Sequence, residues 1–182
     1  MSQWLFGYGS LIWRPDFEFL DAARATLPNY ARKFWQGSHD HRGVPEAPGR
    51  VVTLIDAPGS DCGGMAYQIS EATSAAILSA LDHREKNGYE RRTVTLTLPD
   101  REHTRISALV YLGAPGNFAW FGDAPDAEIA HQISRASGPS GSNVDYLFKL
   151  ADALRKLEYQ DDHVFTLERA VRALQSNRST GD

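Results

Sequence analysis

The chain has 182 residues, 42% of them hydrophobic and 23% charged, and this size and composition predict one globular domain. Nineteen Lys and Arg residues against 23 Asp and Glu residues give a net charge of −4, which argues against nucleic acid and favours a small-molecule substrate. The single cysteine, Cys62, excludes an internal disulfide bond.

The N-terminal segment has no basic region and no sustained apolar run before Gly7, so we expect neither a signal peptide nor a membrane anchor. Together with the lone cysteine, this predicts a cytoplasmic protein that does not bind membranes. At the other end, residues 177–182 carry no apolar anchor. We therefore expect one domain over residues 1–176, followed by a frayed tail.

Short apolar stretches broken by Gly and Pro predict strands in the first two thirds of the chain. These expected strands cover residues 4–6, 31–36, 50–56, 63–69, 92–98 and 106–112, with a turn at residues 57–60. The fifth stretch alternates most regularly, with Val94, Leu96 and Leu98 on one face and threonines on the other. This pattern is typical of a half-buried antiparallel strand.

Apolar residues three and four apart predict four helices. The first begins after Ser70 and stops at Asn87-Gly88, and the second opens with Pro125 as its first helical residue and ends at residues 137–139. Ser142 or Asn143 caps the third, which runs to residue 157, and the fourth spans residues 164–174. Six strands and four helices in this order predict an α+β fold, a small curved or barrel-like sheet clasped by helices.

Residues 5–12, Leu-Phe-Gly-Tyr-Gly-Ser-Leu-Ile, place two glycines one residue apart directly after the first predicted strand. Backbone amides in such a segment can point into one concavity and bind a carboxylate or an oxyanion. The segment lacks the third glycine of a dinucleotide fingerprint and the Gly-Lys-Ser or Gly-Lys-Thr of a Walker loop, and Ser10 lies outside the Gly-x-Ser-x-Gly pattern of hydrolases. A glycine bulge or tight turn without a ligand is the alternative.

Two histidines, His39 and His41, would share one face of an extended segment and raise the question of a metal site. A catalytic zinc needs three protein ligands and a structural zinc four, and no Cys-x-x-Cys or His-Glu-x-x-His pattern supplies the rest. We therefore expect no metal. Arg42 or Arg50 is expected instead to meet an anionic ligand, or a structural carboxylate such as Asp40.

Glu85 falls in the last turn of the first predicted helix, where the negative end of the helix dipole disfavours an ionised carboxylate. Its pKa is therefore expected to rise, which suits a general base. Arg84 and Lys86 oppose this shift, and Asp82 reinforces it if the two carboxyl groups approach each other. The alternative is a solvated acidic residue near a helix end, and Gly88 is a left-handed helix stop in either case.

Residues 138–146 form a glycine-rich loop that enters the third helix, where free amides attract anions. Tyr146 falls in the first turn of that helix. Its two readings are a ligand contact and an amphipathic residue that packs on the core with its hydroxyl in water.

Taken together, these four segments resemble the ChaC-type glutathione-specific γ-glutamylcyclotransferases, in family order and at family spacing. The matching segments are FGYGSLIW at 6–13, RKFWQGSHDHRGVPEAPGRVVTL at 32–54, LDHREKNGY at 81–89 and GPSGSNVDYLFKLADALRKL at 138–157. The resemblance implies a γ-glutamylcyclotransferase-like fold, in which helices surround a small mixed barrel-like sheet. It also implies a cofactor-free lyase that converts glutathione into 5-oxo-L-proline and L-cysteinylglycine.

The resemblance also implies roles for single residues. Glu85 matches the glutamate of the family motif Arg-Glu-Lys-x-Gly-Tyr and is implied as the catalytic acid/base. Tyr146 matches the tyrosine that follows the Gly-Pro-Ser-Gly segment and is implied as a substrate contact. The Tyr-Gly-Ser-Leu loop of the family, with its flanks, implies that the γ-glutamyl group is bound by Gly7, Tyr8, Gly9, Ser10, Leu11 and Ile12.

The implied reaction fits the residues present, because a γ-glutamyl amide carries its own nucleophile, the α-amine, and needs no nucleophilic side chain, metal or cofactor. Tyr8, Trp13, Trp35 and Tyr89 are expected to line a pocket that excludes water. Two alternatives stay open on sequence grounds. One is a cyclotransferase that acts on other γ-glutamyl amino acids or amines, and the other is a non-catalytic domain that binds γ-glutamyl peptides.

Overall fold

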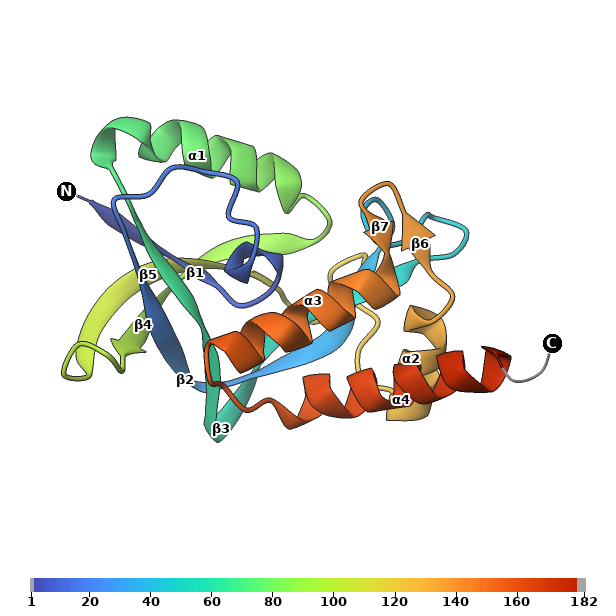
Figure 1. Ribbon diagram of the computed structural model, residues 1–182. Coiled ribbons are helices and arrows are strands. Elements are labelled where there is room, and N and C mark those ends of the chain that lie inside the picture. The colour runs from blue at the N-terminus through green and yellow to red at the C-terminus, as the bar shows by residue number, and fades with distance from the viewer. Residues whose placement is uncertain (1, 180–182) are drawn as a thin grey trace.

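The computed structural model describes residues 2–179, and its centre is a closed barrel with the strand order β1-β3-β2-β4-β5 (Figure 1). The strands are β1 (Gln3–Gly7), β2 (Asp21–Ser38), β3 (Gly49–Ile69), β4 (Tyr89–Leu98) and β5 (Thr104–Gly113). Neighbouring strands are antiparallel except β1 and β5, whose parallel pairing closes the barrel. The expected α+β fold with a mixed barrel-like sheet is confirmed.

Strands β2 and β3 are much longer than the sequence pattern predicted. The expected turn at residues 57–60 is wrong, because these residues stay within β3 and bulge opposite Asn29 of β2. Asn29 and Gly59 have φ angles of 63° and 82°, and the Gly59 amide donates a hydrogen bond of 3.1 Å to Asn29 Oδ1. Turn-forming residues therefore bend one continuous strand pair instead of separating two strands.

The alternation predicted for residues 92–98 is confirmed in β4. Leu96 and Leu98 are fully buried in the barrel core, whereas Thr93 and Thr95 are exposed. Hydrophobic side chains of this period fix the strand register, because a slip by one residue would turn every one of them to solvent.

Side-chain caps define where two of the helices begin. Helix α1 (Glu71–Arg84) follows Ser70, whose hydroxyl accepts a hydrogen bond from the Thr73 amide. Helix α3 (Asn143–Lys156) follows Ser142, whose hydroxyl accepts one from the Asp145 amide. Both caps satisfy amides that lack a partner within the helix. Pro125 is the residue before α2 (Asp126–Ile133), so its expected place as the first helical residue is off by one position.

The remaining elements are short, except for the last helix. A single turn of 3₁₀ helix, η1 (Ser10–Ile12), follows β1, and a small hairpin of β6 (Ser137–Gly138) and β7 (Gly141–Ser142) precedes α3. Helix α4 (Asp162–Ser179) continues through residues 177–179, which we had assigned to a frayed tail. Residues 180–182 of that expected tail lie outside the described residues.

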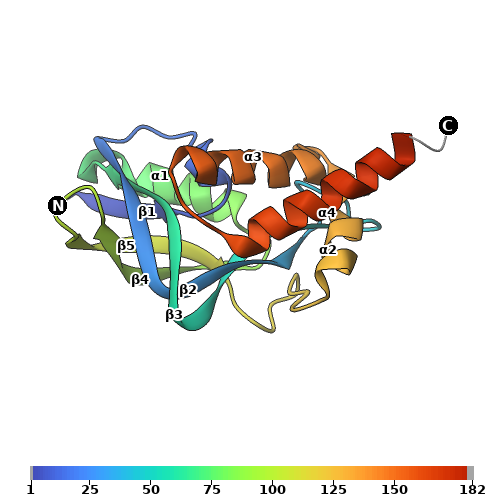
Figure 2. The same ribbon diagram turned by 60° about the horizontal axis from the view of Figure 1, so that its bottom comes forward.

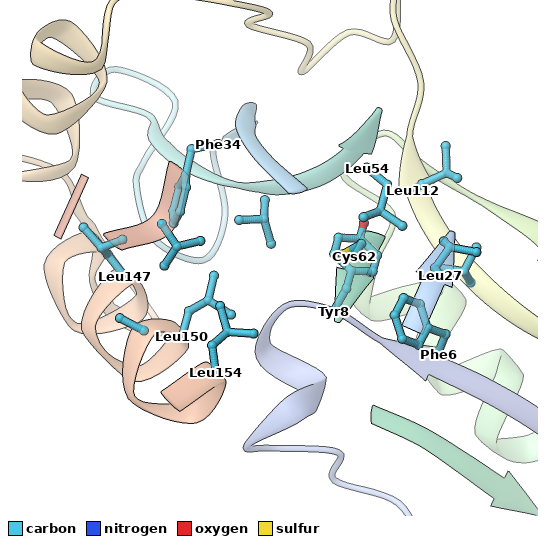
Figure 3. Packing of buried hydrophobic residues seen from close by; sticks show 14 of the residues in the cluster. Phe6, Tyr8, Leu27, Phe34, Leu54, Cys62, Leu112, Leu147, Leu150 and Leu154 are labelled. Carbon is cyan, nitrogen blue, oxygen red and sulfur yellow. The ribbon is translucent and has the colours of Figure 1, made fainter. Parts of the chain in front are cut away.

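Figures 1 and 2 show α4 against both α2 and α3, on a different side of the barrel from α1. The main core lies between α3 and the barrel, where Leu147, Leu150 and Leu154 point toward Phe34 and the barrel residues (Figure 3). A smaller cluster around Leu81 fastens α1 to the outside of β1 and β5. No helix in the described part of the chain is long and apolar enough to cross a bilayer.

Candidate active site

Two adjoining cavities lie where β1, β2 and β5 end and β3 and β4 begin. The inner cavity, of about 50 Å³, is bounded by residues 8–11 and by aromatic side chains of the barrel mouth. The outer cleft, of about 210 Å³, opens between η1, the end of α1, the loop after β2 and the start of α3. Ser10, Glu85, Tyr89 and Tyr146 line both cavities and therefore mark their boundary.

The loop after β1 forms the floor of the inner cavity. None of the amides of Gly9, Ser10 and Leu11 donates a hydrogen bond to any described residue, because the first bonds of η1 run from later amides back to Gly9 and Ser10. Arg32 Nε donates to the Tyr8 carbonyl oxygen at 2.7 Å. Since C=O and N–H point in opposite directions in a trans peptide, this contact turns the Gly9 amide away from Arg32. Three backbone donors are thus left for a ligand.

Two of the residues expected to bind substrate, Gly7 and Ile12, line neither cavity. Gly7 is the last residue of β1, paired with Met65, and a Cβ atom there would lie only 2.7 Å from the Leu11 Cβ. The Ile12 carbonyl lies within 3.3 Å of the Tyr67 hydroxyl that donates to it. Both residues therefore shape the loop, whereas residues 8–11 face the cavity.

Glu85 is the residue directly after α1, and its amide still donates to the Leu81 carbonyl at 2.8 Å. The following turn is tied to the barrel, since Asn87 Nδ2 donates to the Gly37 carbonyl and Gln36 Nε2 donates to the Asn87 carbonyl. Gly88 has the expected left-handed conformation, with a φ angle of 87°, but α1 already ends at Arg84, so Gly88 belongs to the turn that leads into β4 and does not itself stop the helix. These contacts hold Glu85 at the boundary of the two cavities.

The Glu85 side chain is only 20% exposed, and it forms no hydrogen bond with any residue that the structure describes. Its nearest cation is Arg84, whose Nε lies 3.6 Å from Oε1. Burial raises the pKa of the Glu85 carboxyl, Arg84 and His41 act in the opposite direction, and Asp40 reinforces the increase. The direction of this pKa shift is as expected.

Asp82, which we expected to reinforce that pKa increase if it approached Glu85, is engaged elsewhere. Its carboxylate accepts a hydrogen bond of 2.7 Å from the Tyr111 hydroxyl and lies 3.1 Å from Arg91 Nε. Asp40, from the loop after β2, is the acidic neighbour of Glu85. Helical spacing predicts neighbours on the same helix, such as Asp82. It cannot predict that a residue of a distant loop lies near Glu85.

Three tyrosines surround the Glu85 carboxyl as neutral hydrogen-bonding groups. Burial raises the pKa of Tyr8 and of Tyr89 well above the ordinary value and that of Tyr146 to about 12. The Tyr8 hydroxyl donates to the Tyr111 carbonyl, and the Tyr89 hydroxyl donates to the Val52 carbonyl. These contacts fix aromatic walls that limit the access of water.

Of the four aromatic residues expected to line the pocket, Tyr8, Tyr89 and Trp13 do so, but Trp35 does not. Trp35 packs edge-on against Trp120, with ring centroids 6.0 Å apart. A bulge between Lys33 and Gln36 changes which side chains of β2 face inward there, and this bulge is not visible in the sequence pattern.

Tyr146 reaches the cavity because Asn143, at the start of α3, is bonded to the barrel. The Arg50 amide donates to Asn143 Oδ1 and Asn143 Nδ2 donates to the Arg50 carbonyl, each at 2.7 Å. One turn later, the Tyr146 ring packs edge-on against Trp13 and Phe34. Tyr146 therefore packs on the core, as one reading predicted, and it also lines both cavities, where its contact with a ligand stays a prediction.

The cationic side chains divide into two groups. Arg42, Arg84 and Arg14 line the outer cleft, whereas Arg50 donates to Gln132 and to the Phe34 and Gly122 carbonyls outside it. Of the two arginines expected to meet an anion, only Arg42 is thus placed to do so. The sequence pattern indicates only the charge of Arg84, whereas its place in the cleft depends on long-range contacts with Ser10 and Asp16.

The two histidines that raised the question of a metal site lie in different surroundings. His41 lines the outer cleft, whereas the His39 ring packs against Phe121 with centroids 5.7 Å apart. Among residues 2–177, whose side chains are described, no group of three or more His, Cys, Asp or Glu residues could hold a metal ion.

Residues 3–174 match the model of the ChaC-like protein family. A human protein named glutathione-specific gamma-glutamylcyclotransferase 1 is 40% identical over 172 residues, which cover 92% of this chain and 78% of the human one. An Arabidopsis thaliana protein named gamma-glutamylcyclotransferase 2-3 is 42% identical and covers 97% of this chain and 92% of its own length. A yeast crystal structure, described as a gamma-glutamyl cyclotransferase specific to glutathione, superposes with a TM-score of 0.87 at 30% identity, covering 96% of this chain and 99% of the yeast one.

Proposed function

This chain belongs to the ChaC-like family, and from that premise we propose that it is a γ-glutamylcyclotransferase that converts glutathione into 5-oxoproline and cysteinylglycine. One observation carries the proposal at this site. The Glu85 carboxyl lies at the boundary of the two cavities, mostly buried and without a hydrogen bond to any described residue. Its 3.6 Å contact with Arg84 is an ion pair longer than a hydrogen bond, so the carboxyl oxygens can still accept hydrogen bonds from a substrate.

The reaction begins at the α-ammonium group of the substrate. Glu85, as general base, takes one proton from this group, and the freed amine attacks the γ-carbonyl carbon to close a five-membered lactam. Burial supports this role, because it raises the pKa of Glu85 toward the pH at which the base works. Holding amine and carbonyl together in the small inner cavity makes the intramolecular attack efficient.

The tetrahedral intermediate carries a negative oxygen that needs hydrogen-bond donors. The amides of Gly9, Ser10 and Leu11 are without acceptors among the described residues, and they bind this oxygen or the α-carboxylate of the substrate. Glu85 then returns its proton to the leaving nitrogen as the γ-carbon to nitrogen bond breaks. The ring nitrogen loses its second proton to the freed carboxylate of Glu85, and this proton passes to the departing amine, which leaves as an ammonium group. The products are 5-oxoproline and cysteinylglycine, and neither a cofactor nor a metal takes part in these steps.

We infer that the enzyme is cytoplasmic and that its substrate is a small anionic molecule. Cys62 is buried, and burial raises the pKa of its thiol to about 11, so it stays protonated and takes no part in redox chemistry. Since the protein carries a net charge of −4, local donors have to attract the glutathione anion against the overall field.

Product analysis tests the proposal. Wild-type protein incubated with glutathione is expected to release 5-oxoproline and cysteinylglycine in equal amounts, as measured by mass spectrometry. The same assay with γ-glutamyl amino acids and amines separates a glutathione enzyme from one of broader specificity by the ratio of kcat/KM values. Glutathione binding without either product would mean a non-catalytic domain and would contradict the proposal.

A further inference from the structure

Among the side chains that the structure describes, three arginines are almost fully buried, and they differ in how many of their nitrogens have protein acceptors. Arg32, Arg42 and Arg50 are 3%, 7% and 8% exposed. Arg32 donates from Nε, Nη1 and Nη2, and Arg50 donates from Nε and Nη1. Arg42 donates from Nη1 alone, to the Ser142 carbonyl and to Asp145 Oδ2, both at 3.2 Å.

The Nε and Nη2 atoms of Arg42 donate to no described residue. Neither atom is completely buried, so a ligand or solvent can reach them. Arg42 lines the outer cleft, so this edge of the guanidinium is open to the cleft. Two parallel N–H groups on one edge match the two oxygens of a carboxylate, and this bidentate pairing is among the strongest hydrogen-bonded contacts in proteins.

The surroundings of Arg42 hold this edge in place before any ligand binds. The guanidinium lies over the Tyr146 ring, 5.5 Å from its centroid, and the Arg42 amide donates to Ser38 Oγ at 2.9 Å. The Nη1 contacts fix the opposite end of the fork to the start of α3. A donor that is already oriented loses little conformational entropy when a ligand pairs with it.

The other cations of the cleft are engaged with protein groups. Arg84 Nη2 donates to Ser10 Oγ at 2.8 Å, its Nη1 lies 3.6 Å from Asp16, and its Nε lies 3.6 Å from Glu85. Arg14 is paired with Asp16 at 2.7 Å. The acidic groups of the cleft would repel an anionic ligand, so a carboxylate that enters the cleft has the open edge of Arg42 as its best-matched partner.

Glutathione has two carboxylates, and the layout of the cavities distinguishes them. If the γ-carbonyl reacts beside Glu85, as the proposed function requires, the γ-glutamyl group occupies the inner cavity and the cysteinylglycine part extends into the outer cleft. Arg42 lines only the outer cleft. Resting on the proposed function, we propose that Arg42 binds the glycine carboxylate of glutathione and makes the enzyme selective for substrates that carry it.

The test compares glutathione with its C-terminal amide, which lacks only the glycine carboxylate charge, in wild type and in Arg42→Met. Loss of a charge-assisted bidentate contact is expected to lower kcat/KM of the wild type about 10- to 100-fold on the amide. Arg42→Met is expected to lose a similar factor on glutathione, mostly through KM, and to lose little more on the amide. This non-additivity is the signature of a direct contact.

Two further variants guard against a purely structural effect. Arg42→Lys keeps the charge and part of the packing and carries the test if the Met variant does not fold; its preference for glutathione over the amide is expected to be reduced but present. Asp145→Asn removes a charge beside Arg42 Nη1 but keeps a side-chain oxygen that can accept there, the Ser142 contact and the open edge. Any loss of activity in this variant is expected to be similar on both substrates, so the preference for glutathione over the amide remains.

Equal activity of the wild type on glutathione and on the amide would overturn the assignment of Arg42 while leaving the proposed function intact. The same conclusion follows if Arg42→Met loses activity equally on both substrates. If the wild type forms no 5-oxoproline from glutathione at all, the proposed function itself fails, and the role of Arg42 fails with it.

Discussion

Arg32 and Arg42 have nearly the same exposure, yet they lie in regions of opposite character. Around Arg32, the guanidinium is fully bonded to the Tyr8 and Gly63 carbonyls and to Asp161, which also caps the start of α4 through Val164. Around Arg42, one guanidinium edge and the amides of residues 9–11 lack hydrogen-bond partners among the described residues, and the Glu85 carboxyl has only the 3.6 Å ion pair with Arg84. Fully paired buried polar groups hold a fold together, whereas unpaired ones beside a cavity indicate a ligand site.

The two regions meet at the loop after β1. Arg32 bonds the Tyr8 carbonyl, and residues 9–11, whose amides have no acceptor among the described residues, line the inner cavity. The packed region thus positions the donors that the open region presents. Substitutions in the open region should change activity with little loss of stability, whereas those in the packed region should mainly lower stability.

The largest expected effect is that of Glu85→Gln. Removal of the general base should lower kcat with glutathione about 10²- to 10⁴-fold. Because burial raises the pKa of Glu85, the folded state binds its proton more tightly than the unfolded state, and stability falls as pH rises through the raised value. At neutral pH the uncharged glutamine should therefore raise the free energy of unfolding by about 0.5–2 kcal/mol, measured by urea denaturation.

Glu90→Gln is a matched control for this variant, because Glu90 is exposed on β4 and lines neither cavity. It should keep wild-type activity and stability. Substantial turnover by Glu85→Gln would show that another group is the base, and a large loss of stability in that variant would contradict the view that burial disfavours the charged carboxyl.

Arg32→Met tests the packed region. The substitution leaves Asp161 partly buried without its cation and should lower the free energy of unfolding by about 3–5 kcal/mol. Arg42→Met, which loses the contacts of Nη1 and the contact of the guanidinium with the Tyr146 ring, should cost about 1–2 kcal/mol in the same urea titration. Equal losses of stability in the two variants would remove the distinction between the regions.

Gly9→Ala tests the contact between the loop and α3. A Cβ atom at this position would lie 3.0 Å from both the Tyr146 hydroxyl oxygen and Val52 Cγ2, so the loop must shift by a few tenths of an ångström. Misplacement of the backbone donors should lower kcat/KM roughly tenfold. Tyr146→Phe removes one of the two crowding atoms, so the double variant should lose less than the product of the single effects. Strict additivity would argue against this contact.

The smallest expected effects are shifts in the pH dependence of kcat/KM. Activity requires ionised Glu85, so the rate should fall as pH drops through its raised pKa, above the pH at which an ordinary carboxyl titrates. Asp40→Asn removes a charge that raises this pKa and should move the acidic limb to lower pH. Arg84→Gln removes a charge that lowers it and should move the limb to higher pH. Shifts of the opposite sign would exclude Glu85 as the titrating group.

Local signals in the sequence predicted much of this fold. Caps such as Ser70 and Ser142, the alternation of β4 and the left-handed Gly88 each act over a few residues, and the position of Glu85 at the end of α1 follows from them. The resemblance to a family added the barrel and grouped the four segments that build the site.

Long-range contacts account for what the sequence did not predict. The first half of β2, residues 21–30, contains Pro28 and Asn29, which favour turns, yet pairing with β3 keeps it in the barrel. The open edge of Arg42 depends on partners about 100 residues away, at Ser142 and Asp145. The acidic neighbour of Glu85 is Asp40, from a different loop, and helical spacing alone pointed to Asp82.

The most direct test of the central claim is the reaction with glutathione in water enriched in ¹⁸O, followed by mass spectrometry of the products. Attack by the substrate's own amine forms the lactam without water, so 5-oxoproline is expected to appear without ¹⁸O, beside an equal amount of cysteinylglycine. Glutamate that carries ¹⁸O in its γ-carboxyl group would show that water is the nucleophile, and it would contradict a cyclotransferase mechanism at Glu85.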